Sequence, residues 1–340
     1  MKFIHIADVH WGARPEREQT FGRIREQEIK ETFQRVIDHA NKQQVDLLLI
    51  AGDLFDQPPT QQELREVDYL LSRLNHTRTV LIAGNHDHLE PHDVFSQYKW
   101  NSEVYLLDGK QRDHISFEDL ETTIYGFSYW KNQITKPLYD RMKPDESESS
   151  DFSILLAHGG DESHIPIQRE ALKWSGFDYI ALGHIHKPMK VGSELYRYCG
   201  TPLACSVSEA QQQKGIIMVE MGVKGEIKTT ILPLEPLRQV KVVKGTLEEV
   251  LKESCKDYVT VVLTDKADLD VIDMQERIRL AFPNLLEIRR ENLRKADYTR
   301  TLQTEELLDP YELCCSFLKD LDEEEKMILQ DVLHTVQGVK

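Results

Sequence analysis

Cysteine is scarce in this chain, and long apolar runs are missing. The 340 residues include five cysteines, which are Cys199, Cys205, Cys255, Cys314 and Cys315. None forms a CxxC pair or a zinc-finger spacing, so we expect reduced thiols, no disulfide framework and no structural zinc. No apolar run approaches the roughly 20 residues that a membrane-spanning helix needs. Residues 1–8 lack the pattern of a signal peptide, which predicts a cytoplasmic protein without a membrane partner.

Basic residues are also in deficit. The chain has 42 Lys plus Arg against 58 Asp plus Glu, a formal net charge of −16. A nucleic-acid partner is normally bound through Lys and Arg, so the acidity argues against one. The argument is weak, because bound metal ions can make a site positive locally. Low Pro and Gly with 40% apolar residues exclude collagen-like and low-complexity classes.

The first two thirds of the chain alternate short apolar runs with amphipathic stretches. This alternation predicts an α/β catalytic domain over residues 1–236. Helices are predicted at 24–43 and 64–74. Strands are predicted at 1–7, 45–51, 79–83, 122–127, 153–157, 179–182 and 215–220.

The remaining sequence divides into a small module and a tail. Residues 237–300 predict an α+β domain with strands at 239–243, 258–263 and 285–290 and helices at 247–253 and 271–282. Residues 301–340 contain two helical patterns, the first starting at Asp309-Pro310. The tail is acidic with an apolar face, and packing on its own chain or on a partner both remain open.

Metal-ligating residue types follow five of the predicted strands. The clusters are Asp8-Val-His10, Gly52-Asp53-Leu-Phe-Asp56, Gly84-Asn85-His86-Asp87, His158-Gly159 and Gly183-His184-Ile-His186. Ligands of open α/β sheets bind at the carboxyl ends of the strands, so we expect all five clusters to converge there. Asp8 and His10 are two residues apart and would point the same way if the strand pleat continues.

These clusters predict a particular kind of metal chemistry. Carboxylates, imidazoles and a carboxamide without thiolate suit Mn²⁺, Fe or Zn²⁺. The ligands suffice for two ions sharing a carboxylate, and two ions about 3.5 to 4 Å apart can clamp the attacking and leaving oxygens of a displacement at phosphorus. The glycines that precede Asp53, Asn85 and His184 allow tight turns around the ions.

The ordered set DxH, GDxxD, GNHD, HG and GHxH resembles the calcineurin-like metallophosphoesterase superfamily. Residues 3–12, 51–56 and 83–87 are similar to the nuclease subunit of bacterial SbcCD-type DNA repair exonucleases, the counterpart of the eukaryotic meiotic-recombination nuclease. The resemblance implies a metallophosphoesterase sandwich of two central β-sheets flanked by helices, a DNA-capping domain and C-terminal helices. It further implies a homodimer whose tail docks onto an SbcC-type, SMC-like ATPase.

The resemblance also implies a role for each motif residue. Asp8, His10 and His186 would hold one ion, with Asp53 bridging to the second. Asn85, His158 and His184 would complete the ligands of the second ion. His86 would contact the scissile phosphate and protonate the leaving oxygen, with Asp87 orienting it. Two Mn²⁺ ions are the expected cofactors, with Mg²⁺, Fe or Zn²⁺ as alternatives.

The resulting prediction is a two-metal DNA nuclease, a double-strand exonuclease with some endonuclease activity, in DNA repair or recombination. One alternative is a binuclear phosphodiesterase or phosphatase acting on a nucleotide or phosphoprotein. Another is a non-catalytic scaffold. The module beyond residue 237 favours DNA over a small substrate, and the filled ligand positions argue against a scaffold.

Six basic residues are predicted to contact DNA. They are Arg14, Arg17, Arg289, Arg290, Arg294 and Lys295. Glu16, Glu18, Glu26 and Glu28 interleave with the first arginines, so pairing between side chains is an equal alternative. We expect Asp56 to support a ligand or cap a turn, His5 to face the sheet packing, and His164 to have no role.

Overall fold

The computed structural model describes residues 1–110, 113–145, 150–223, 226–265 and 271–291, together with 325, 326, 329 and 332. The chain divides into two compact units, Met1–Arg289 and Arg290–Lys340. The two helical patterns expected within residues 301–340 fall almost entirely outside the described residues. Among the helices that are described, none has the length and apolar character needed to cross a bilayer.

The first sheet carries the N-terminus in its middle. Its six strands run in the order β12-β11-β1-β2-β3-β4. β1 to β4 are mutually parallel, whereas β11 is antiparallel to β1 and to β12. The bounds are β1 Lys2–Ile6, β2 Leu47–Ala51, β3 Arg78–Ile82, β4 Val104–Leu106, β11 Gly215–Met221 and β12 Ile227–Pro233.

The second sheet is built from the middle of the chain in the order β5-β6-β7-β8-β10-β9. β6, β7, β8 and β10 are parallel, and β5 and β9 form antiparallel edges. The bounds are β5 Asp113–Phe117, β6 Thr122–Gly126, β7 Phe152–His158, β8 Tyr179–Gly183, β9 Met189–Ser193 and β10 Tyr196–Tyr198. The short strands β4, β5, β9 and β10 and the solvent-facing β12 were not predicted from the sequence.

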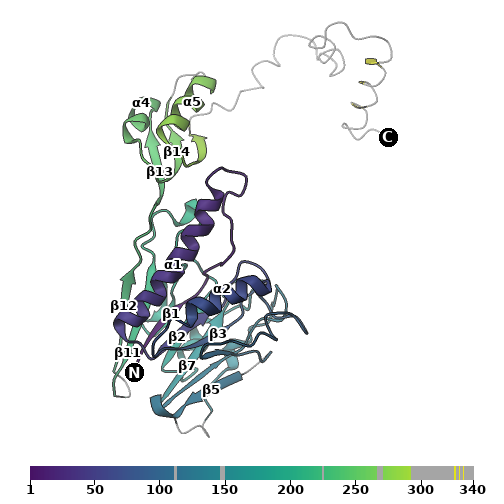
Figure 1. Cartoon of the computed structure of the whole chain (residues 1–340), viewed down its shortest axis with the longest axis vertical. Helices are drawn as coiled ribbons and strands as arrows, with labels where there is room; N and C mark the ends of the chain where they lie inside the picture. The colour runs from purple at the N-terminus through teal and green to yellow at the C-terminus, as the bar shows by residue number, and fades with distance from the viewer. Residues whose placement is uncertain are drawn as a thin grey trace. The chain divides into compact units, whose positions relative to one another are not determined.

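The two sheets pack face to face, and helices cover their outer faces. β2 shows why, because alternate residues of a strand point to opposite sides. Leu47 and Leu49 join the apolar layer between the sheets, while Leu48 and Ile50 pack under α1 (Gly22–Gln43) and α2 (Gln61–Leu71). Figure 1 shows both helices lying over β1, β2 and β3. The shorter α3 (Arg169–Lys173) packs on the second sheet through Leu172. The predicted sandwich of two sheets with flanking helices is confirmed.

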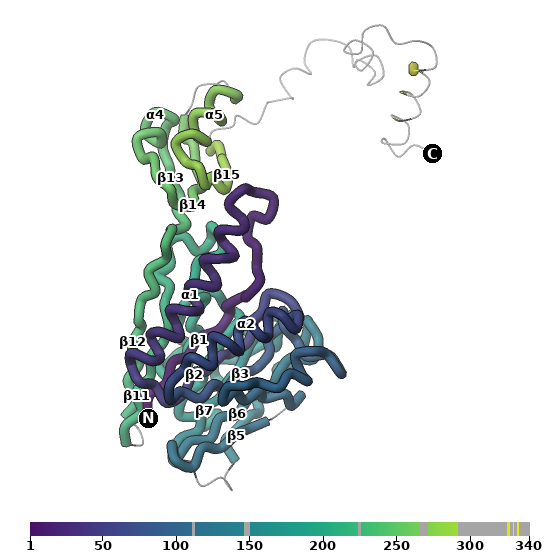
Figure 2. The backbone as a smooth tube through the Cα atoms, in the orientation of Figure 1, coloured from purple at the N-terminus to yellow at the C-terminus, as the bar shows by residue number. Residues whose placement is uncertain are grey.

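A third, smaller sheet follows in the order β13-β14-β15 (Figure 2). Its strands are β13 Val240–Gly245, β14 Tyr258–Leu263 and β15 Leu285–Arg290, and its helices are α4 Leu247–Val250 and α5 Val271–Ala281. Apolar residues from both helices and from β13 and β14 form a separate core. The expected strands and helices of this module are therefore present.

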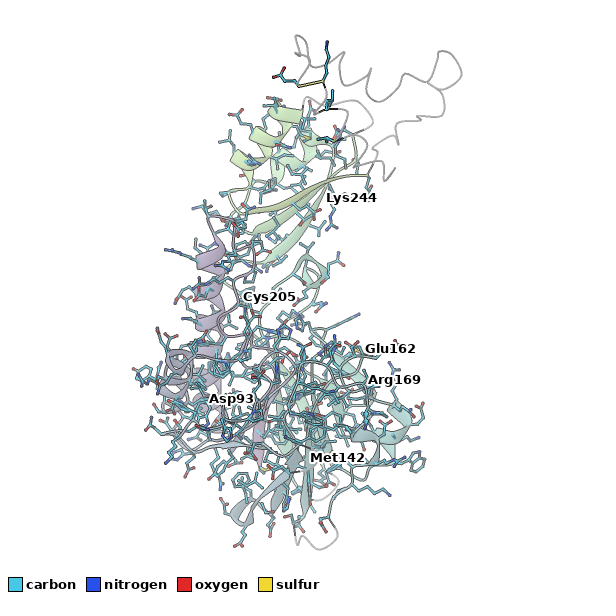
Figure 3. The ribbon with its side chains drawn as sticks, turned by 90° about the vertical axis from the view of Figure 1, so that its right-hand side faces the viewer. Asp93, Met142, Glu162, Arg169, Cys205 and Lys244 are labelled. Atoms are coloured by element: carbon cyan, nitrogen blue, oxygen red, sulfur yellow. The ribbon has the colours of Figure 1, made fainter. Side chains whose placement is uncertain are left out.

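The module meets the N-terminal part of α1 through Tyr258. The Tyr258 ring packs beside Phe21 and Val240, and the Arg25 guanidinium lies 4.3 Å from its centre. The Tyr258 hydroxyl donates to Glu28 Oε2 at 2.9 Å. Arg25 also donates to the carbonyl of Cys205 at 2.7 Å, and Figure 3 labels Cys205 at this junction.

Tyr258→Phe should lower the free energy of unfolding by about 1 to 3 kcal/mol, because the buried acceptor Glu28 loses a donor. Urea unfolding of the full chain measures this. Tyr69→Phe is the control, since Tyr69 is 68% exposed and its change should stay within about 0.5 kcal/mol. Equal stabilities of the two variants would contradict the role given to the Tyr258 hydroxyl.

Candidate metal centre

The five motif clusters lie together where the ends of the two large sheets meet. Asp8 and His10 follow β1, Asp53 follows β2, and residues 84–87 follow β3. From the second sheet, His158 ends β7, and His184 and His186 follow β8. Asp8, His10, Asp53, Asn85 and His158 are all at most 5% exposed. The site is thus assembled from both sheets, at the carboxyl ends of parallel strands.

The ligating atoms predicted from the sequence form two groups, and His86 also has a ligating atom within 4.8 Å of those of His10 and Asp53. Those of Asp8, His10 and His186 lie within 4.8 Å of one another, as do those of Asp53, His158 and His184. In the first group, the Nε2 atoms of His10 and His186 are 3.2 Å apart.

Asn85 and Asp53 complete the second group. Asn85 Oδ1 is 3.0 Å from both His158 Nε2 and His184 Nδ1. Asp53 Oδ2 is 3.3 Å from His158 Nε2, and Asp53 also has ligating atoms within 4.8 Å of His10. Asp53 therefore stands between the two groups, as a bridging carboxylate must.

The residues after β1 and β2 reach these positions by tight turns. Asp8, His10 and Asp53 have φ values of 53°, 52° and 50°, in the left-handed region. The strand pleat does not continue to Asp8 and His10, because β1 ends at Ile6, so the turns bring their ligating atoms within 4.8 Å of each other. Such backbone costs of order 1 to 3 kcal/mol for each residue and persists where the surroundings hold it. Here the N–H groups of Asp8 and His10 donate to the carbonyls of Gly52 and Asp53.

Two glycines leave space for the ligand side chains. Gly52 has a φ of 88°, and a β-carbon there would collide with the His158 ring. A β-carbon at Gly84 would collide with the Asp53 carboxylate. Any larger residue would displace the carboxylate or the imidazole on which both groups depend.

The outward nitrogen of each histidine faces an oxygen. His158 Nδ1 is 2.9 Å from the Ala51 carbonyl, and His10 Nδ1 is 3.3 Å from Asp56. A carbonyl or carboxylate oxygen only accepts, so the proton of the neutral ring sits on the nitrogen facing it. In the neutral ring that binds metal, the inward Nε2 would then offer its lone pair. Asp56 thus lies where it can support a ligand.

Two further carboxylates also face the outward nitrogen of a histidine, and neither was predicted from the sequence. Glu209 lies 3.4 Å from His186 Nδ1, and Asp161 lies 2.7 Å from His184 Nε2. Neither belongs to a motif. The sequence held one indication of Asp161, which is that it follows the predicted ligand His158 by only three residues. His164, which was expected to have no role, also lies 2.9 Å from Asp161.

The buried charges attract one another strongly. Burial would raise the pKa of Asp53, but the charge and hydrogen bond of His158, with His10, lower it below its usual range. Burial likewise opposes protonation of His158, yet Asp53 raises its pKa to about 9. A histidine binds metal only when neutral, so a metal ion bound here would replace this proton.

His86 and Asp87 are neighbours in the chain, but they differ in burial and in their contacts. The His86 ring is exposed, its Nδ1 is 2.9 Å from the Asp56 carbonyl, and its N–H donates to Asp53 Oδ1. Asp87 is buried and accepts from the N–H groups of Gly84 and Phe55. Burial and then the charge of Asp53 raise the pKa of Asp87 to about 7. The expectation that Asp87 orients the His86 ring is therefore corrected, because its oxygens hold the loop backbone instead.

The candidate DNA contacts differ in their surroundings. Arg14 pairs with Glu26 at 2.7 Å and Arg289 with Glu287 at 2.7 Å, while Arg17 is exposed and Arg290 half-buried. Arg294 and Lys295 lie outside the described residues. His5 is buried between the sheets, 3.1 Å from the Tyr179 hydroxyl, as expected.

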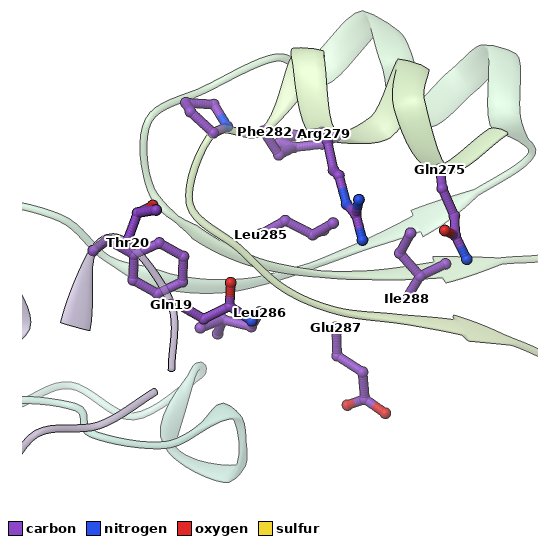
Figure 4. A pocket seen from close by; sticks show the side chains of 11 residues that line it. Gln19, Thr20, Gln275, Arg279, Phe282, Leu285, Leu286, Glu287 and Ile288 are labelled. Carbon is purple, nitrogen blue, oxygen red and sulfur yellow. The ribbon is translucent and has the colours of Figure 1, made fainter. Parts of the chain in front are cut away.

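A sizeable pocket lies away from the strand-end cluster of ligand candidates. Its volume is about 610 Å³, and it is lined by Gln19 and Phe21 on one side and by Arg279, Leu286 and Ile288 of the small module on the other (Figure 4). Among the described residues its lining includes Glu287 but no histidine or aspartate. It therefore lacks the donor set for a metal-dependent reaction, which the strand-end cluster has.

Comparison with known proteins agrees with this geometry. The calcineurin-like phosphoesterase family matches residues 1–188, more than half of the 340 residues. The chain belongs to this family. It is therefore a metal-dependent phosphoesterase, and membership implies a binuclear divalent metal centre. Residues 234–321 match a second family, described as the type 5 capsule protein repressor C-terminal domain.

Curated relatives cover most of the chain. The SbcD component of the nuclease SbcCD from Staphylococcus epidermidis is 26% identical over 322 residues, covering 84% of each chain. The protein of the same name from Staphylococcus saprophyticus is 26% identical over 324 residues, also covering 84% of each. An uncharacterized metallophosphoesterase of Bacillus subtilis, YhaO, is 32% identical over 213 residues, 57% of this chain and 50% of its own.

Glu209→Gln should lower the free energy of unfolding by about 3 kcal/mol or more, because it leaves a buried charge uncompensated. Glu209 and Lys214 are 2.7 Å apart, with side chains only 4% and 5% exposed. Glu287→Gln removes the same charge from an exposed pair with Arg289 and should cost less than about 1 kcal/mol. Urea unfolding of the metal-free variants measures both losses. Similar losses of unfolding free energy in the two variants would contradict the larger contribution given to the buried pair.

Proposed function

We propose that this chain is a two-metal-dependent DNA nuclease acting on duplex ends in DNA repair or recombination. The observation that carries the proposal is the meeting of two ligand groups at Asp53, with the exposed His86 ring beside them. In this proposal Asp8, His10 and His186 hold one ion, Asn85, His158 and His184 hold the other, and Asp53 bridges.

The donor set of this centre suits Mn²⁺, with Mg²⁺, Fe or Zn²⁺ as alternatives. The fit rests on inward nitrogens whose partner atoms fix the proton on the opposite side of each ring, such as Ala51 for His158. Two ions bound here would polarise the phosphate and stabilise the attacking and leaving oxygens of an in-line displacement. The protein's part is to hold the ligands in place before substrate arrives.

His86 is the group that this chain supplies for proton transfer. Its Nδ1–H donates to the Asp56 carbonyl, so when the ring is doubly protonated the proton on Nε2 is the one free to pass to the leaving oxygen. Its backbone N–H donates to Asp53 Oδ1 at 2.9 Å, and its ring lies edge-on to His10 at 4.8 Å. The proton-bearing atom is therefore held next to both ligand groups without being buried among them.

DNA is favoured as the substrate by the extra module and by the relatives. Two relatives that cover 84% of this chain carry the name of a nuclease subunit. Their being subunits supports a partner, and the chain has no GxxxxGK[ST] phosphate loop of its own. We propose an SbcC-type ATPase as that partner, a homodimer as the working form, and the cytoplasm as its location.

His86→Ala should lower turnover by at least about 100-fold while leaving metal content unchanged, because the lost group moves a proton and ligates nothing. His10→Ala should instead lower metal content. Metal analysis beside cleavage assays separates the two effects. A His86→Ala enzyme that cleaves normally would refute the role of His86, and one that loses metal would make it a ligand.

The function itself is tested on four substrates. The purified chain with Mn²⁺ should cleave end-labelled duplex DNA, and chelation by EDTA should abolish the reaction. Single-stranded DNA, circular DNA and a generic phosphodiester are the comparisons. Cleavage of the generic ester alone would overturn the nuclease proposal and leave a phosphodiesterase with a small substrate.

A further inference from the structure

Asp161 lies on the loop that leaves β7, three residues after the ligand candidate His158. This loop is tied down on several sides. The Tyr198 hydroxyl donates to the Gly159 carbonyl at 2.9 Å, and the N–H of Gly160 donates to the His164 carbonyl at 2.9 Å. The Tyr129 hydroxyl donates to the His158 carbonyl at 3.0 Å. The position of Asp161 is therefore set by the same loop that presents His158.

The two oxygens of Asp161 share one partner, His164 Nδ1, which lies 2.9 Å from each, and otherwise have different ones. Oδ1 accepts from the backbone N–H groups of Ser163 at 2.8 Å and His164 at 2.9 Å. Oδ2 lies 2.7 Å from His184 Nε2. The other ring nitrogen of His184, Nδ1, faces Asn85 Oδ1 at 3.0 Å. The Asp161 carboxylate thus links its own turn to Nε2 of His184. The opposite nitrogen of that ring, Nδ1, faces the second ligand group.

The distances alone would also allow Asp161, His164 and His184 to hold a metal ion. The hydrogen bonds argue otherwise. Oδ1 already accepts two backbone N–H groups, and a third metal would need the lone pair of His184 Nε2. Since Nδ1 faces the second group, a ring ligating on both sides would have to lose both protons, which a neutral imidazole does not do.

We propose that Asp161 is a positioning residue for His184 at the second ion site, an inference that rests on the two-ion centre proposed above. The carboxylate accepts the Nε2–H hydrogen bond, which keeps the proton on that nitrogen and the lone pair of Nδ1 toward the metal. Carboxylate partners of this kind typically change metal affinity by about 10- to 100-fold. Because the Asp161 side chain is 48% exposed and water can partly replace it, we expect the lower end, about 10-fold.

Asp161→Asn gives the sharper test of this inference. The backbone N–H groups of Ser163 and His164 require an acceptor at Oδ1, so the amide oxygen takes that place and the NH₂ group faces His184. An NH₂ group can only donate, and His184 would then carry its proton on Nδ1, the nitrogen that should bind metal. The variant keeps size and turn but reverses the polarity of one hydrogen bond.

The experiment titrates the metal-free full-length chain with MnCl₂ by calorimetry, with electron paramagnetic resonance of the loaded samples. The wild type should bind two ions and give the spectrum of a coupled Mn²⁺ pair. Asp161→Ala should weaken one of the two binding events about 10-fold and leave the other unchanged. Asp161→Asn should weaken the same event at least as much, with isolated Mn²⁺ signals replacing those of the pair.

Glu162→Gln is the matched control, because Glu162 is the exposed neighbour labelled in Figure 3 and loses the same charge. It should bind Mn²⁺ as the wild type does. If Asp161→Ala fails to fold, Asp161→Asn, which preserves the turn, carries the test. Wild-type binding by Asp161→Asn would overturn this inference alone. A wild type that binds fewer than two ions would overturn the two-ion centre and the inference with it.

Discussion

The structure depends on bringing negative carboxylates and imidazole lone pairs together in a confined, buried space. Asp53 is the centre of this constraint, being 1% exposed and within reach of both ligand groups. Burial raises the pKa of Asp53, but its neighbours His158 and His10 lower it by more, so the net pKa is lowered. Burying such a charge is costly unless a partner compensates it, and divalent ions are the strongest compensation available.

The scaffold meets this constraint by rigidity. The parallel strands β1, β2 and β3 end side by side, and β7 and β8 of the opposing sheet end against them across an apolar layer. The turns that follow adopt left-handed conformations at Asp8, His10 and Asp53, which are held by hydrogen bonds between the turns. Strain of this kind is stable only where the surrounding core determines it, and here two fully packed sheets do so.

The net charge of −16 acquires a different meaning in this setting. Some of the acids are ligand candidates, and others, such as Asp56, Asp161 and Glu209, lie behind the histidines. Arg14, Arg25 and Arg289 pair with glutamates. In the function proposed above, the metal ions would supply much of the attraction for a phosphodiester, whereas Arg25 joins α1 to the small module.

The sequence by itself determined the elements and the ligand types. Apolar periodicity located β1, β2, β3, β7 and β8, because buried strands and amphipathic helices have distinct periods, and polar motifs at their ends marked the site. It did not reveal the short edge strands, whose few residues show no clear period. Only the tertiary structure decided that Asp161 and Glu209 stand behind His184 and His186, and that Asp87 holds the backbone of Gly84 and Phe55 rather than the His86 ring. The reason is physical: a motif records residues that are neighbours along the chain, whereas a hydrogen bond to the outer nitrogen of a histidine comes from whichever loop the packing brings there.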